Sequence, residues 1–450
     1  MSSAANGSGS GDPYLPDNGD DGYHVEHYDL AITYRPSTNR LDGHVVADVV
    51  ALRPVRRLAF DLANLSVAKV LVDGARPKRF RQQGAKLMIA LAGALETGRS
   101  LRVSITYSGH PAPISGRWGT VGWEELDDGA LVAGQPNGAP SWFPCNDRPS
   151  DKATYRISVT TEADYRVVAN GLLVGRSRSA SRVTWVYEQR EPMATYLAAV
   201  HVGRFELQEL PGREVAQHAV GPDRLRTRIA TDFGRSDRMM RCFSERFGPY
   251  PFAAYTVIVT EDELEIPLEA QGMSIFGANH VDGRHGYDRL IAHELAHQWF
   301  GNSLTPARWS DIWLNEGFAC YAEWLWSEES GGPAAHEHAQ REWRRLRDAP
   351  QDLVLADPGP DLMFDDRVYK RGALAVHALR RAIGTSRFVE VIRDWTAANR
   401  HGSVTTAAFL AHVDAAAAAG EGARKLLKPW LFAQRLPELP RDGELRAARR

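Results

Sequence analysis

Two histidines four residues apart, His293 and His297, constrain this chain more than any other feature of its sequence. Residues at this spacing lie on one face of a helix, so both imidazoles can point at one metal ion. Glu294 lies beside that face, where its carboxylate can reach a water on the metal without becoming a ligand. Glu316 follows on a second predicted helix that begins near Asn315, and it can supply a third ligand. The pattern predicts one zinc ion per chain, held by three ligands with one open position.

The segments around these residues support both helices. Leu290, Ile291, Leu295 and Trp299 recur near helical spacing, and a second apolar pattern runs over residues 318–325. Two histidines and two glutamates on such apolar helices would be buried at high cost if they were unpaired. We therefore favour a metal site over two ordinary core helices.

The motifs resemble those of the M1 family of zinc aminopeptidases. Thermolysin-type endopeptidases share the use of two helices, but the matching flanks are those of the M1 family. The resemblance covers the chain from about Tyr28 to about Pro437. It rests on five segments in the family's order: WFPCNDRP (142–149), KATY (152–155), HELAHQWFGN (293–302), WSDIWLNEGFA (309–319) and VYKRGAL (368–374).

The fold class that we expect is multidomain, β followed by α+β. Alternating apolar residues in short segments predict an N-terminal β-sandwich over residues 23–208, in agreement with the N-terminal domain of the M1 family. A thermolysin-like peptidase domain, mostly helical after the zinc helix, is expected over residues 209–438. Residues 1–22, rich in Ser, Gly, Asn and Asp, are expected to form a flexible tail, and residues 439–450 a C-terminal tail. The resemblance implies a short form without the family's helical C-terminal domain.

The resemblance also implies the chemistry. Glu294 is expected to act as general base and then general acid. Tyr369 matches the family tyrosine whose hydroxyl donates a hydrogen bond to the developing oxyanion. The residues after it depart from the family pattern, because Lys370 and Arg371 stand where an acidic residue and a lysine are common.

Two further residues are expected to bind substrate. Glu269 matches the glutamate that binds the free amino group of a peptide, on a strand shortly before the zinc helix. Ile266 and Ala270 stand in place of the glycine and asparagine of that strand. Gln135 matches a recognition residue of the β-domain, but Asn137 replaces the acidic residue that follows it. The changes at Ile266 and Ala270 preserve the essential charge of Glu269 and alter its surroundings, whereas Asn137 weakens the negative pocket.

Charge and cysteine content bear on the partners and the cellular compartment of the protein. A net charge of −2 gives no reason to expect nucleic acid or an acidic membrane as partner. The cysteines, Cys145, Cys242 and Cys320, cannot all pair and show no metal-binding spacing, which fits a reducing compartment. The sequence shows neither a membrane-spanning apolar run nor a secretory signal, so we expect a cytoplasmic protein. The sequence does not predict its oligomeric state.

The function that we expect is zinc-dependent aminopeptidase activity on peptides with a free N-terminus. One alternative is a zinc endopeptidase or another amide hydrolase on the same scaffold, which would cleave N-terminally blocked peptides. Another is a non-catalytic peptide-binding relative. The presence together of His293, Glu294, His297, Glu316 and Tyr369 argues against a pure binding protein, which has no need of all five.

Overall fold

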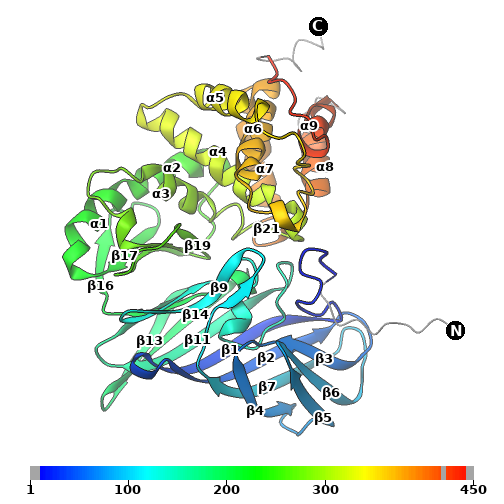
Figure 1. Ribbon diagram of the computed structural model, residues 1–450, viewed down its shortest axis with the longest axis vertical. Helices are drawn as coiled ribbons and strands as arrows, with labels where there is room; N and C mark the ends of the chain where they lie inside the picture. The colour runs from blue at the N-terminus through cyan, green and yellow to red at the C-terminus, as the bar shows by residue number, and fades with distance from the viewer. Residues whose placement is uncertain (1–10, 417–421, 442–450) are drawn as a thin grey trace, which may run out of the picture. The chain divides into compact units, whose positions relative to one another are not determined.

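The computed structural model describes residues 11–416 and 422–441. The predicted tail residues 1–10 and 442–450 lie outside this part. The chain divides into two compact units, Met1–Glu206 and Leu207–Arg450. Strands make up most of the first unit, and the second combines a sheet with helices (Figure 1). The predicted order, a β-rich part followed by an α+β catalytic part, is confirmed.

The first unit is built on a seven-stranded sheet in the order β13-β14-β11-β1-β2-β7-β4. Its central strand β1 pairs in parallel with β11 and antiparallel with β2. The strands of this sheet are β1 (Tyr23–Arg35), β2 (Arg40–Ala51), β4 (Leu65–Val72), β7 (Ser100–Gly109), β11 (Lys152–Glu162), β13 (Leu172–Ser179) and β14 (Arg182–Ala194).

Two smaller sheets belong to the same unit. One runs β12-β15-β10-β9-β8 and the other β3-β6-β5. Their strands are β3 (Val55–Asp61), β5 (Arg79–Gln83), β6 (Lys86–Leu95), β8 (Ile114–Gly116), β9 (Gly119–Leu126), β10 (Gly129–Ala133), β12 (Arg166–Ala169) and β15 (Val200–Gly203).

Alternating burial along β1 creates the core of the first unit. Apart from an irregularity between Val25 and His27, every second residue is buried, so one face of the large sheet is covered. The ring of Tyr34 lies 4.8 Å from that of Trp123 in β9, and the ring of Tyr23 lies 5.5 Å from that of Phe60 in β3. The large sheet therefore packs on both smaller sheets through aromatic side chains, as expected for a β-sandwich.

Residues 11–22 differ from the predicted flexible tail. The backbone N–H of Gly19 donates to Asp61 at 2.7 Å, and that of Asp20 donates to Asn146 at 2.7 Å. The polar composition of this segment suggested disorder because it offers little apolar surface to bury. It is held instead by hydrogen bonds to buried polar side chains, and the prediction of a flexible tail is wrong for these residues.

The second unit contains a five-stranded sheet in the order β16-β17-β18-β20-β19. Strands β17, β18 and β20 are parallel, and the edge strand β19 is antiparallel to β20. The strands are β16 (Glu206–Leu210), which begins at the last residue of the first unit, β17 (Ala216–Gly221), β18 (Ala254–Val259), β19 (Leu268–Ala270) and β20 (Met273–Phe276). A separate pair is formed by β21 (Thr305–Pro306) and β22 (Ser403–Val404).

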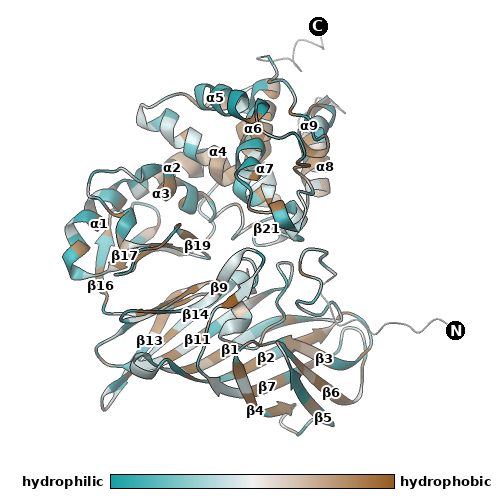
Figure 2. Cartoon of the chain, in the orientation of Figure 1, coloured by the Kyte–Doolittle hydropathy of each residue, from teal (hydrophilic) through white to brown (hydrophobic). Residues whose placement is uncertain are grey.

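The regular structure that remains in the described part of this unit is mainly α-helical. They are α1 (Arg226–Asp232), α2 (Ser236–Phe247), α3 (Asp288–Ala296), α4 (Trp313–Ser330), α5 (Ala335–Arg347), α6 (Asp366–Ile383), α7 (Thr385–Ala398), α8 (Thr406–Ala416) and α9 (Gly422–Phe432). Helix α5 is mostly hydrophilic, whereas α4 is buried over most of its length and α8 is more hydrophobic (Figure 2). Among the described residues, no helix is both long and apolar enough to cross a membrane.

Helices α4 and α6 approach closely at a pair of glycines. A Cβ atom added to Gly317 would lie 2.8 Å from the Cα atom of Gly372, and one added to Gly372 would lie 2.7 Å from that of Gly317. Side chains at this crossing would force the helices apart. Gly317 follows Glu316 directly, and Gly372 lies three residues after Tyr369 on α6. The close crossing therefore brings the predicted oxyanion donor toward the predicted metal ligand.

Candidate active site

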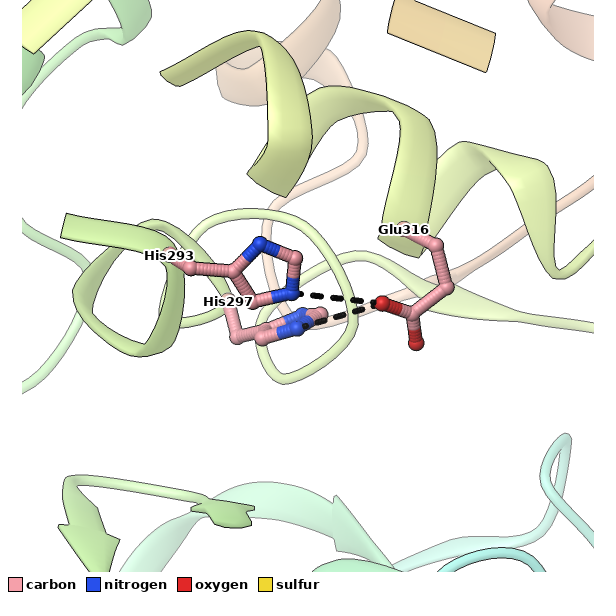
Figure 3. A group of neighbouring side chains, drawn as sticks. All are labelled: His293, His297 and Glu316. Carbon is pink, nitrogen blue, oxygen red and sulfur yellow. Dashed lines mark ion pairs between the residues drawn. The ribbon is translucent and has the colours of Figure 1, made fainter. Parts of the chain in front are cut away.

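The predicted metal ligands come together from α3 and α4. His293 lies in the last turn of α3, and His297 caps its C-terminus with a helical backbone, so the four-residue spacing is preserved. Their Nε2 atoms lie 3.4 and 3.5 Å from the same Glu316 oxygen, Oε2. Figure 3 shows both imidazoles turned toward this carboxylate. All three side chains are buried. The structure thus brings the three predicted ligands to one point.

Each histidine is oriented by a partner at its other ring nitrogen. Nδ1 of His293 lies 2.8 Å from Oε1 of Glu323, and Nδ1 of His297 lies 3.0 Å from the carbonyl oxygen of Phe300. Such contacts fix the ring and its tautomer, which leaves Nε2 of each ring for a metal.

The two histidines differ in their electrostatics. Burial lowers the pKa of His293, but the carboxylates of Glu316 and Glu323 outweigh burial and raise that pKa to about 10. Burial lowers the pKa of His297 below its ordinary value. The difference follows from the partners, because His293 has a carboxylate at each ring nitrogen and the Nδ1 atom of His297 faces a neutral carbonyl. The carboxylates around His293 therefore favour a positive charge at this place.

These residues fit zinc. Two donor atoms at about 2.0–2.1 Å from a tetrahedral zinc are separated by about 3.4 Å, which matches both Nε2–Oε2 distances. Two imidazoles and one carboxylate are a common donor set of catalytic zinc sites. In addition, Oε2 of the buried Glu294 has no hydrogen-bond partner among the described residues. A buried carboxylate oxygen without a partner is costly, so this one is explained by a ligand or water at the site.

Glu294 and Glu269 complete a second side of the cluster. Carboxylate oxygens of these two residues and a ring nitrogen of His297 lie within 4.8 Å of one another. This trio could also hold a cation, but it shares His297 with the first group and contains only one nitrogen donor. The group of His293, His297 and Glu316 therefore suits a zinc ion better than this trio. Burial raises the pKa of Glu294 to about 7, in the range useful for proton transfer at neutral pH.

Glu269 is half-buried on the edge strand β19, as expected for a strand before the zinc helix. The chain just after the zinc histidines holds the turn that follows this residue. Nε2 of Gln298 donates to the carbonyl oxygens of Ala270 and Met273 at 3.2 and 3.1 Å, and its Oε1 accepts from the N–H of Gly272 at 2.9 Å. The turn after Glu269 is therefore tied to the chain that follows the zinc helix.

Tyr369 lies in the first turn of α6, beside the metal ligands. Its ring is stacked on that of His293, with centroids 6.1 Å apart and an interplanar angle of 21°. Burial, followed by the charges of Glu316, Glu269 and Glu294, raises the pKa of Tyr369 well above its ordinary value. The phenol therefore keeps its proton at neutral pH and can donate a hydrogen bond.

The other predicted substrate residue, Gln135, belongs to the first unit. It is half-buried, follows β10, and is joined to Pro136 by a cis peptide bond. Its role as a substrate contact stays a prediction.

Sequence reasoning missed Glu323 and Gln298. Glu323 lies seven residues after Glu316 on the same helix, and two helical turns bring it back to the same face. This spacing is a signal that could have identified it as a partner of His293. The contacts of Gln298 with the turn after β19 carry no comparable signal, because they depend on how a distant strand packs on the zinc helix.

Comparisons with known proteins agree with this geometry. The model of the peptidase family M1 domain matches residues 232–430, and that of the peptidase M1 N-terminal domain matches residues 24–197. Leucine aminopeptidase 2 of Ajellomyces capsulatus (strain NAm1 / WU24) is 26% identical over 89% of this chain, which spans 69% of that relative. Aminopeptidase M1-D of Oryza sativa subsp. japonica is 24% identical over 88% of this chain, which spans 48% of that relative.

A solved structure of similar length has a similar fold. The M1 zinc metallopeptidase from Deinococcus radiodurans has a TM-score of 0.89 and 32% identity, and the match covers 96% of this chain and 100% of that one. A mutant of that protein has been solved with a Tyr-Ser-Ala substrate. With two family domains in order and a structural relative matched along its whole length, the chain belongs to peptidase family M1, and zinc is the cofactor that this membership implies.

Proposed function

We propose that this protein is a zinc aminopeptidase that removes the N-terminal residue of peptides. The observation that carries the proposal is the convergence at His297 of a metal-binding trio and of two further carboxylates, Glu294 and Glu269. The metal-binding trio with Glu294 suits peptide-bond hydrolysis, and Glu269 supplies the negative charge that a free amino terminus requires. The relatives named as aminopeptidases support the same function.

In this proposal, His293, His297 and Glu316 hold the metal. When bound, zinc lowers the pKa of a water to about 7 and polarises the scissile carbonyl. Glu294 accepts a proton from the attacking water as the water oxygen forms a bond to the carbonyl carbon. The same carboxyl then gives that proton to the leaving nitrogen as the C–N bond breaks. With a pKa near 7, Glu294 suits both halves of this transfer.

Tyr369 is proposed to stabilise the negative charge that develops on the carbonyl oxygen. Its raised pKa keeps the hydroxyl protonated, so it donates without releasing its proton. A donor that is already in position for the transition state contributes more to kcat than to substrate binding. The close crossing of α4 and α6 at Gly317 and Gly372 supports this role, because it keeps Tyr369 beside the ligands.

Glu269 is proposed to bind the substrate's α-amino group, whose pKa of about 7.7–8.0 leaves it largely cationic at neutral pH. The Gln298 hydrogen bonds fix the turn after Glu269 relative to the zinc helix. A peptide with a free amine would then place its first peptide bond, and not an internal one, at the metal. Gln135 is proposed as an additional substrate contact. The Tyr-Ser-Ala substrate of the Deinococcus relative supports short peptides as the substrate class.

The direct test is hydrolysis of aminoacyl reporter substrates by the purified protein. We expect turnover that disappears when a chelator removes the metal and returns when one equivalent of zinc is restored. A metal-free protein with undiminished turnover would contradict the proposal. A panel of different aminoacyl groups would then define the preferred first residue.

We also propose that the protein works in the cytoplasm. Its cysteines are free thiols, and all three are buried. Thiols of this kind persist in reducing compartments. Fractionation of the producing cells, followed by immunodetection, would test the location, and recovery outside the cytoplasm would overturn it.

A further inference from the structure

Lys370 directly follows the proposed oxyanion donor, and its side chain contacts Cys320 and Glu323. Its Nζ lies 3.9 Å from Oε2 of Glu323 and donates a hydrogen bond to Sγ of Cys320 at 3.2 Å. Only 17% of its side chain is exposed. Burial opposes the charged form, but Cys320 and Glu323 raise the pKa of Lys370 above its ordinary value, so the ammonium is charged at neutral pH.

Glu323 connects this ammonium to a metal ligand. One of its carboxylate oxygens, Oε1, contacts Nδ1 of His293, and the other, Oε2, faces Lys370 and Arg289. The Glu323 side chain is 4% exposed, so its orientation depends on these partners more than on water. A carboxylate at the far nitrogen of a metal-ligating histidine orients the ring and raises its basicity.

We propose that Lys370 is a positioning residue of the zinc site, which acts through Glu323 to hold His293 in its metal-binding orientation. The inference rests on the zinc site of the proposed function and concerns a residue that does not touch the metal or the substrate. Lys370 acts by keeping Oε2 of Glu323 in place, so that Oε1 remains on Nδ1 and Nε2 stays directed at the metal. Removing Lys370 leaves Glu323 with one fewer cation at a buried position, and the imidazole loses part of its support.

Arg289 is the second cation that contacts Glu323, and we expect it to contribute less than Lys370. Its guanidinium lies 3.1 Å from Oε2 of Glu323, closer than the ammonium of Lys370, but 60% of its side chain is exposed. Exposed ion pairs are weakened by solvent and salt. A cavity of about 570 Å³ borders Arg289, Lys370 and Glu323, so water reaches one side of this group. We therefore expect Lys370 to matter more than Arg289, and both to matter less than Glu323 itself.

The test is zinc affinity, measured by chelator competition with the full chain in its metal-free form. Loss of the direct partner in Glu323→Gln should weaken zinc binding about 10- to 100-fold, and Lys370→Met, one contact further out, about 3- to 10-fold. Lys370→Gln should behave like Lys370→Met, and Lys370→Arg should restore most of the affinity because it keeps the charge. Lys425→Met, on the exposed face of α9, removes the same charge elsewhere in the unit and should leave affinity unchanged.

Thermal unfolding of the metal-free proteins separates positioning from a merely structural role. We expect the metal-free Lys370 variants to melt with the wild type, while their zinc affinity falls. The inference is overturned if Lys370→Met and Lys370→Gln bind zinc as tightly as the wild type. It is also overturned if Lys425→Met loses as much affinity, or if Lys370→Arg is as weak as Lys370→Met. Zinc binding that survives His297→Ala would instead contradict the proposed metal site itself.

Discussion

Two buried polar clusters, one in each unit, have similar composition and opposite character. The zinc cluster consists of His293, Glu294, His297 and Glu316. The second, which we name the Asn146 network, consists of Asp20, Asp61, Asn146, Asp147 and Asp151, all less than 9% exposed. Both collect carboxylates away from water, where uncompensated charge is expensive.

The polar groups of the Asn146 network form hydrogen bonds and ion pairs with one another and with neighbouring groups. Asp61 pairs with Lys86 at 2.5 Å and accepts the backbone N–H of Gly19 and, at 3.2 Å, that of Asp147. The side-chain amide of Asn146 donates to Asp151 at 2.5 Å, and its oxygen accepts from the N–H of Asp20. These groups use one another as partners, and they tie residues 11–22 to the β-sandwich.

The zinc cluster is arranged in the opposite way. Its nitrogen and oxygen atoms converge on one point, and one oxygen of Glu294 has no partner in the part of the chain that the structure describes. Within that part, ligand atoms of three His, Cys, Asp or Glu residues come within 4.8 Å of one another only in groups that include His297. Burial of polar groups alone thus does not mark a functional site, whereas convergence of several ligand atoms on one point, beside a carboxylate oxygen without a partner, does.

The largest expected effect is that of His297→Ala. It removes one of three ligands, and we expect zinc and activity to be lost together. The matched control is Asn146→Ala, which disturbs the other polar cluster and should retain one zinc per chain. Elemental analysis of both purified variants gives the result. Undiminished zinc in His297→Ala would place the metal elsewhere and remove the distinction between the clusters.

Glu294→Gln should separate metal binding from proton transfer. The amide preserves the shape of the side chain but cannot accept a proton, so zinc should stay while kcat falls by about 10²- to 10⁴-fold. Measuring zinc content and steady-state kinetics on the same preparation provides the comparison. Turnover close to that of the wild type would exclude Glu294 as the proton carrier.

A smaller loss is expected for Tyr369→Phe. Deleting one donor to the developing oxyanion should lower kcat by about 10²- to 10³-fold and leave KM and zinc content nearly unchanged. Steady-state kinetics on an aminoacyl reporter distinguishes the two constants. A change confined to KM would instead make Tyr369 a contact of the bound substrate.

Asn146→Ala should have the smallest effect on catalysis and a clear effect on stability. It leaves Oδ2 of Asp151 and the N–H of Asp20 without the hydrogen bonds that Asn146 supplies, at a cost of about 1–3 kcal/mol for each unsatisfied group. The melting temperature should fall, while the KM and kcat of the folded enzyme persist. Kinetic constants that change with unaltered stability would assign a functional role to the Asn146 network.

The zinc cluster was largely predictable from sequence because its geometry is local. The spacing of His293 and His297 and a following helix with Glu316 required only helical periodicity. Glu323 was equally accessible in principle, since it repeats after two turns of the same helix. The strand that carries Glu269 could be located only through resemblance to a family.

The remaining features depend on contacts between distant segments. The order of residues 11–22 comes from side chains more than 40 positions away, such as Asp61 and Asn146. The buried Arg371, which departs from the family pattern, donates to the carbonyl oxygens of Trp430 and Leu353 at 2.9 and 3.0 Å. No periodicity in the sequence indicates such pairs. Sequence reasoning thus succeeds where function rests on one or two helices, and fails where long-range hydrogen bonds fix a segment.

The most direct test of the central claim compares one peptide with a free amino terminus and the same peptide with an acetylated one. An aminopeptidase that binds the amine through Glu269 should prefer the free peptide by roughly 100-fold or more in kcat/KM, the low end for an unpaired charge because Glu269 is half-buried. Glu269→Gln should lose most of this preference and keep its zinc. Efficient cleavage of the acetylated peptide by the wild type, with release of internal fragments, would contradict the aminopeptidase assignment and identify an endopeptidase at the same zinc site.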